Sequence, residues 1–198
     1  MKFLQYINEK RTNNVIAVDI QPMYKNYIRF PIWKFTDFLL EQRKILYFYN
    51  GPDTLGSDSK NDIIDWLMEE SDYNEELYKK LSSKDTIYYD KGYAFFRGWM
   101  DNGADPAFIK QAVRFMLQRK VYDSRDIEPE EWEEKFPNDW DDSFDYDNIY
   151  IPDIPLNILK QFSGSYIVGG GRNECLKEVQ ILMSIFNIRA KEVKDFIY

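Results

Sequence analysis

The chain has 198 residues, of which 44% are apolar and 17% aromatic, and its net charge is −8. This length favours a single domain, residues 1–198, and the apolar content is enough for a packed core, which argues against a disordered chain. One cysteine and no histidine exclude an internal disulfide, Ser-His-Asp or Cys-His catalysis, and zinc sites built from histidines or several cysteines.

The single thiol favours a reducing compartment, so we expect a cytoplasmic protein. No segment approaches the roughly 20 apolar residues that span a bilayer, and the polar start of the chain does not have the pattern of a secretory signal. We therefore expect no membrane partner.

The negative charge is concentrated in one segment. Residues 123–147 contain twelve acids and two bases, a net charge of −10, whereas the rest of the chain sums to +2. We interpret residues 123–149 as an acidic insertion with a solvated surface within an almost neutral domain.

In chain order, strands and helices are expected to alternate. Residues 2–9 suggest a short amphipathic helix, and apolar β-branched or aromatic runs predict buried strands at residues 15–20, 44–49, 86–89 and 165–168. A last strand is expected at residues 189–196 and a short edge segment at 150–154. Helical patterns occupy residues 33–42, 62–70, 74–81, 94–101, 106–119, 158–162 and 173–186. This alternation predicts an α/β fold: a three-layer, mostly parallel, Rossmann-like sheet with helices on both faces.

The first candidate site is the turn GGGRNEC, which joins a predicted strand to a predicted helix. In open α/β sheets, ligands bind beyond the carboxyl ends of the strands, and free amides at a helix start favour an anion or a thiolate. Cys175 would lie in the first helical turn, where its pKa should fall. The alternative is a tight turn beside a small buried thiol. The candidate ligand-binding residues are Gly169, Gly170, Gly171, Arg172, Asn173 and Glu174.

Two more candidates follow predicted strands. Asp19 ends the first strand, where the alternative role is a turn cap, and Lys91 follows the third strand, where the alternative is a solvated lysine. Since Asp19, Lys91 and Cys175 each come after a strand of a parallel sheet, all three are expected at one edge.

These residues resemble the isochorismatase-like cysteine hydrolases. In that family the first strand ends in Asp-x-Gln, as Asp19 and Gln21 do here, and a Lys precedes a segment of small and aromatic residues, as Lys91 does. A strand–Gly–loop–Cys–helix unit is matched by residues 168–176. The resemblance implies Cys175 as nucleophile, Asp19 as general base and Lys91 as the group that lowers the thiol pKa. It also implies an oxyanion hole of amides between Gly171 and Cys175, a small-molecule amide, ester or enol ether substrate, and no cofactor.

The sequence departs from that family in two respects. Lys91 and Cys175 are separated by 83 residues, a longer spacing that the acidic segment would account for. The absence of histidine removes the metal site of the nicotinamidase branch, so we do not expect that substrate.

A carboxylate-based alternative remains open. Asp19, Asp53, Asp123 and Asp126 follow predicted strands or lie in the acidic segment, and carboxylates bind Mg²⁺ or Mn²⁺. A PIN-like nuclease resembles this arrangement, and only this alternative implies a nucleic acid partner. Phosphate would then meet the amides of residues 169–171, with Arg172 as a contact.

A third alternative is a protein without enzymatic activity. Residues 1–9, MKFLQYINE, are similar to the capsid-targeting leader of internal head proteins of T-even-like bacteriophages, which the prohead protease cuts after the Glu. This similarity implies a phage accessory protein, an inhibitor of a host system or a binding module, in the host cytoplasm or the virion head. The sequence leaves the oligomeric state open.

Overall fold

The computed structural model describes residues 13–20, 24, 26–50, 77, 79, 82, 85–91, 95–139, 149–151 and 154–198. Within these residues five strands form one sheet: β1 (Val15–Val18), β2 (Ile45–Tyr49), β3 (Thr86–Asp90), β4 (Ser165–Gly169) and β5 (Ala190–Glu192). All neighbouring strands are parallel, in the order β3-β2-β1-β4-β5. The predicted α/β class with a parallel sheet is confirmed.

The central strands are apolar along their whole length because both of their faces are covered. Every residue of β1 and β2 is buried. Ile16 and Val18 point into one hydrophobic cluster, while Val15 and Ala17 point into a second cluster on the opposite face. This explains why the strands contain continuous apolar runs rather than alternating polar and apolar residues.

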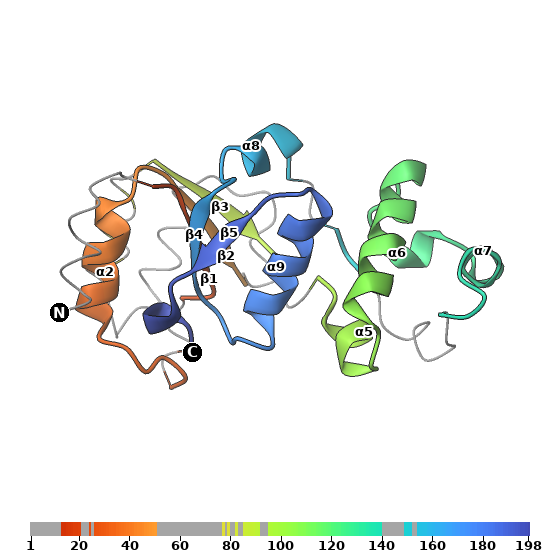
Figure 1. Cartoon of the computed structure of the whole chain (residues 1–198), viewed down its shortest axis with the longest axis horizontal. Coiled ribbons are helices and arrows are strands. Elements are labelled where there is room, and N and C mark those ends of the chain that lie inside the picture. Colours follow the sequence, from red (N-terminus) through yellow and green to blue (C-terminus); the bar gives the residue numbers. More distant parts are fainter. Residues whose placement is uncertain are drawn as a thin grey trace.

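The chain adds strands on both sides of β1, and helices cover both faces of the sheet (Figure 1). Helix α2 (Ile32–Glu41) connects β1 to β2 and packs Phe35 and Leu39 into the second cluster. Helix α9 (Cys175–Ile185) connects β4 to β5 and packs into the first cluster on the other face. The winding therefore reverses between β1 and β4, and the carboxyl ends of those two strands are the place where such sheets bind ligands.

A group of helices lies on the side of α9 that faces away from the sheet (Figure 1). It contains α5 (Arg97–Asp101), α6 (Pro106–Arg119), the 3₁₀ helix η2 (Ser124–Asp126) and α7 (Pro129–Lys135). Helix α6 begins as expected, with Pro106 in its first turn and the Asp105 carboxylate accepting a hydrogen bond of 2.6 Å from the Ala107 amide. This group packs against α9 through α6.

In the described part of the acidic segment the charged side chains are mostly exposed, as predicted, but the aromatic residues between them are buried. Trp132 is buried, and its ring lies 5.7 Å from that of Trp99 and 5.4 Å from that of Phe115. The acids of α7 are exposed apart from the half-buried Glu131, which pairs with Arg119 of α6, while Trp132 and Phe136 lie in the core of the helical group. An aromatic residue on the inner side of an otherwise acidic helix is enough to anchor it.

Several further expectations need correction or lie outside the described residues. The last strand is only Ala190–Glu192, because Val193 leads into the 3₁₀ helix η4 (Lys194–Phe196). Of the edge segment expected at residues 150–154, Tyr150 forms an isolated bridge to Asp123, and residues 152–153 lie outside the described part of the chain. The brief helix before β4 is α8 (Leu156–Lys160). The helices expected at residues 2–9 and 62–70, and most of 74–81, fall outside the described residues. No helix in the described part of the chain has the length and apolar character to cross a membrane.

Candidate active site

The backbone of the sheet brings Asp19 and Lys91 to the same edge. The Asp19 amide donates a hydrogen bond of 2.9 Å to the carbonyl of Phe48, and the Lys91 amide donates one of 2.9 Å to the carbonyl of Tyr49. Both residues therefore extend the ladder just past the carboxyl ends of β1 and β3, on either side of β2. The expectation that they share one edge agrees with this geometry.

The two side chains form a buried ion pair. The Lys91 Nζ atom lies 3.1 Å from Asp19 Oδ2, and neither side chain has any exposed surface. Burial raises the pKa of Asp19, and the charge of Lys91 opposes that rise. Burial by itself would lower the pKa of Lys91, but the neighbouring Asp19, Cys175 and Glu178 outweigh it and raise that pKa. Lys91 is thus a buried cation rather than the solvated lysine of the alternative interpretation.

Cys175 reaches the same carboxylate from the other side of β1. It is the first residue of α9, after the turn that follows β4, and its thiol lies beside the Asp19 carboxylate within reach of a hydrogen bond. Neither oxygen of Asp19 has a hydrogen bond of good geometry among the described residues. The carboxylate therefore has acceptor capacity left for the proton of the thiol.

The glycine turn permits this approach. Val18 of β1 pairs with Gly169 of β4, so the turn begins directly beside Asp19. Gly169 has a φ of +77°, and a Cβ atom there would lie 2.2 Å from the Val18 carbonyl oxygen. Gly170 has a φ of +65°, and a Cβ atom there would lie 3.0 Å from the Leu176 amide nitrogen. Two glycines are needed because the turn passes against the backbones of β1 and α9.

Asp19 itself is in a strained conformation. Its φ is +48°, in the left-handed region that few residues other than glycine adopt. The hydroxyl of Tyr198 donates a hydrogen bond of 2.7 Å to the Asp19 carbonyl oxygen and so helps to hold this conformation. Tyr198 also accepts a hydrogen bond of 3.0 Å from the Arg172 amide and donates one of 3.3 Å to the Gly170 carbonyl. Tyr198 thus connects the end of β1 to the glycine turn through hydrogen bonds.

The thiol does not have the low pKa that its place at a helix start predicts. Burial, and after it the charge of Asp19, raise the pKa of Cys175 to about 12, although Lys91 lowers it. The expectation was wrong for the resting protein because burial and an adjacent carboxylate outweigh the helix terminus and one cation. The Cys175 side chain is therefore a neutral thiol next to a base.

The remaining residues of the turn have mixed environments. Arg172 forms an ion pair of 3.4 Å with Glu192, and Glu174 forms one of 3.7 Å with Arg97. Asn173 is exposed. The amides of Glu174 and Leu176 donate to the Gly171 carbonyl, whereas those of Asn173 and Cys175 donate no hydrogen bond to described residues. Gln21 lies outside the described residues.

Two further residues of this site have no distinguishing motif in the sequence. Glu178, within α9, is 1% exposed and interacts electrostatically with Lys91 and Asp19. Tyr24 is half-buried, and burial followed by the charge of Asp19 raises its pKa to about 12. The apolar pattern of α9 would have revealed Glu178, because a lone acid on the buried side of a helix is unusual.

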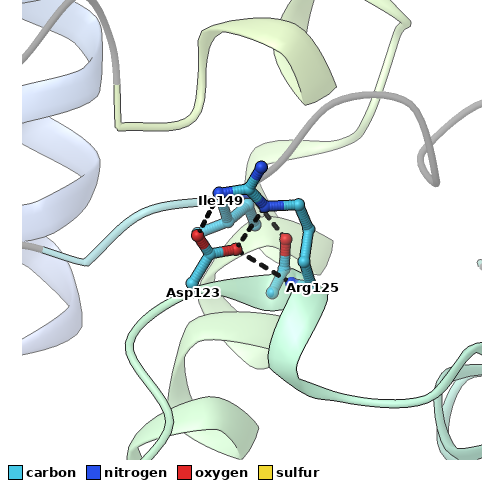
Figure 2. A network of polar contacts seen from close by, with 4 residues as sticks. Asp123, Arg125 and Ile149 are labelled. Carbon is cyan, nitrogen blue, oxygen red and sulfur yellow. Dashed lines mark hydrogen bonds and ion pairs between the residues drawn. The ribbon is translucent and has the colours of Figure 1, made fainter.

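The residues of the carboxylate alternative do not gather in the same way. Arg125 holds the Asp123 carboxylate from two sides, with its Nε atom 3.0 Å from Oδ1 and an Nη atom 2.7 Å from Oδ2 (Figure 2). Asp53 lies outside the described residues. Among the residues that the structure describes, no three acids, cysteines or histidines are grouped so that they could hold a metal ion.

Comparison of the chain with protein-family models, with curated proteins and with solved structures gives no match. The site is therefore interpreted from its own geometry.

Proposed function

We propose that the protein is a small-molecule hydrolase that uses Cys175 as its nucleophile. The observation that carries this proposal is the contact of a thiol, a carboxylate and an ammonium group supplied by three distant segments, at the edge where the sheet reverses its winding. Burying an ion pair costs free energy, and such pairs with perturbed pKa values are common at functional sites.

The chemistry follows from the neutral thiol. When a carbonyl substrate binds, the sulfur attacks the carbonyl carbon, and the proton of the thiol passes to Asp19. The substrate oxygen becomes an oxyanion, for which the amides of Asn173 and Cys175 are available donors. Asp19 then returns the proton to the leaving amine or alcohol as its bond to carbon breaks. A water molecule then attacks the thioester carbon and gives a proton to Asp19; the bond between carbon and sulfur breaks, the acid leaves, and Asp19 returns the proton to the sulfur of Cys175.

Lys91 has an electrostatic role in this scheme. A carboxylate buried without a partner would hold a proton at neutral pH, and Asp19 could not then act as a base. The ammonium group 3.1 Å away favours the ionised form of Asp19 and stabilises negative charge that develops on the sulfur. Both effects are stronger at the buried pair of Asp19 and Lys91 than in water.

The test is a panel of small esters and amides of carboxylic acids with the wild-type protein and the variants Cys175→Ser and Asp19→Asn. We expect turnover by the wild-type protein, and an acyl adduct on Cys175 seen by intact-mass spectrometry after rapid acid quenching. Because the chain contains one cysteine, any thioester adduct is assigned without ambiguity.

The turnover rate of both variants should fall at least about a hundredfold, which is the lower end of the contribution of a general base to catalysis. Glu134→Gln, an exposed substitution on α7, serves as the matched control and should keep the wild-type rate. Full activity in Cys175→Ser would overturn the proposal, and so would Mn²⁺-dependent cleavage of nucleic acid without any turnover of the panel.

A further inference from the structure

Glu178 is a second carboxylate at this site whose presence core packing does not explain. It lies three residues after Cys175 on α9, so both side chains occupy the same side of the helix. Its neighbours Val179, Leu182 and Ile185 on α9 are buried apolar residues. A carboxylate in this setting costs desolvation free energy that an apolar residue would avoid.

The two oxygens of Glu178 have different environments. Oε1 accepts a hydrogen bond of 2.7 Å from the amide of Phe96, the residue before the first turn of α5. Oε2 is buried and has no hydrogen-bond partner within the described residues. Holding the Phe96 amide needs only one neutral acceptor, so this hydrogen bond does not require the charge of the side chain.

The charged groups around Glu178 come from four elements. They are Lys91 after β3, Asp19 after β1, Arg97 on α5 and Cys175 on α9 itself. The pKa of Glu178 is raised to about 7, because burial and the charge of Asp19 outweigh the Phe96 amide, Lys91 and Arg97, which lower it. In turn, the ionised form of Glu178 raises the pKa of the Cys175 thiol.

We propose that Glu178 is a positioning residue that holds the start of α5 through the Phe96 amide and, by its own charge, controls the reactivity of Cys175. When Glu178 is protonated, Asp19 has no competing buried carboxylate beside Lys91, and the thiol gives up its proton more readily. When Glu178 is ionised, its negative charge opposes a thiolate. This inference deepens the proposed hydrolase mechanism and rests on it for the role of Cys175.

The test uses alkylation of Cys175 by iodoacetamide, which needs no substrate. Glu178→Gln keeps an oxygen for the Phe96 amide but cannot ionise, so it separates the charge from the hydrogen bond. Rates are measured from pH 5.5 to 9 for this variant and the wild-type protein. The ratio of the two rates should rise from about one at pH 5.5 to about tenfold at pH 9, the effect of one pKa unit on the thiolate population.

The control is Glu134→Gln, which removes an exposed charge on α7, outside this cluster. Solvent screens that charge, so the rate ratio should stay within about twofold at every pH. A rate ratio for Glu178→Gln that does not change with pH would overturn the proposal, because a purely structural role predicts a constant factor.

A third measurement covers the case in which Glu178→Gln does not fold. In the wild-type protein alone, the logarithm of the alkylation rate should rise with pH by less than one unit per pH unit between about pH 6 and 8, while Glu178 ionises. A slope of one throughout that range would overturn the proposal. A pH-dependent ratio of alkylation rates without any Cys175-dependent turnover of esters or amides would refute the proposed hydrolase function. The coupling of Glu178 to Cys175 would still hold in that case.

Discussion

Replacing Lys91 by Met tests the buried ion pair directly. The substitution keeps the length and most of the apolar volume of the side chain but removes the cation 3.1 Å from Asp19 Oδ2. With an effective dielectric constant of about 20, two unit charges at that distance attract each other by about 5 kcal/mol. Breaking a buried pair by removing one partner typically costs about 3–5 kcal/mol, since the other charge stays in the interior. We expect a loss of that size at pH 7.5.

The double variant Asp19→Asn, Lys91→Met provides the control. It removes both charges, so no unpaired ion remains and the protein should be more stable than Lys91→Met alone. Urea denaturation followed by circular dichroism measures the free energy of unfolding of the wild-type protein, both single variants and the double variant. The ion pair is not formed in solution if the stability losses of the two single variants add up to the loss of the double variant. A stability loss below about 1 kcal/mol in Lys91→Met would lead to the same conclusion.

The pH dependence of the stability of Lys91→Met is a second test of the same ion pair. Burial raises the pKa of Asp19, and without Lys91 only the hydrogen bond of the Cys175 thiol opposes that rise. A carboxyl group whose pKa is higher in the folded than in the unfolded state stabilises the fold at low pH, and this stability is lost as the pH rises. The variant should therefore regain stability as the pH falls from 7.5 toward the ordinary pKa of aspartate. No recovery at pH 5 would contradict this account of Asp19.

Four further predictions address other parts of the structure. Since the pKa of Glu178 rises from 4.5 to about 7 on folding, the wild-type protein should lose about 3 kcal/mol of stability as the pH rises from 4.5 to 7, and Glu178→Gln should flatten that curve. Gly169→Ala should abolish folding or cost more than about 3 kcal/mol by its clash with β1, whereas Gly164→Ala, at a φ of +81° in open space, should cost only about 1 kcal/mol; equal losses in thermal melts would refute the clash. Trp132→Ala should cost about 3–5 kcal/mol in urea denaturation if α7 is anchored as described, and a loss below 1 kcal/mol would contradict that anchoring. Tyr198→Phe should cost about 1 kcal/mol, the value of its 2.7 Å hydrogen bond to the end of β1, and no change in stability would exclude that bond.

The strands and their parallel arrangement could be predicted because both depend on local patterns. Runs such as VIAV and ILYFY are apolar at every position, a pattern that suits strands covered on both faces. The length of β5 was overestimated because Val193 and Phe196 look like strand residues, although they pack into the cluster of α2, where Val193 precedes η4 and Phe196 ends it. Local propensity cannot distinguish a strand from an apolar segment that covers the core.

The candidate site was predictable in part for the same reason. Asp19, Lys91 and Cys175 each follow a strand, and the topology of a parallel sheet brings the ends of its strands to one edge. The environment of these side chains was not predictable. The helix start suggested a lowered thiol pKa for Cys175, whereas burial beside Asp19 raises it, and burial is a property of the whole packed chain.

The sequence by itself determined which strands form, the need for glycine after β4, and which three reactive side chains follow strand ends. Only the tertiary structure decided that Lys91 is a buried cation bonded to Asp19, that Glu178 faces the same cluster, and that Trp132 lies in a core rather than on a charged surface. The physical reason is the distance along the chain over which each effect acts. Backbone preferences and apolar periodicity act over a few neighbouring residues, while desolvation and charge pairing depend on side chains that packing brings together from distant segments.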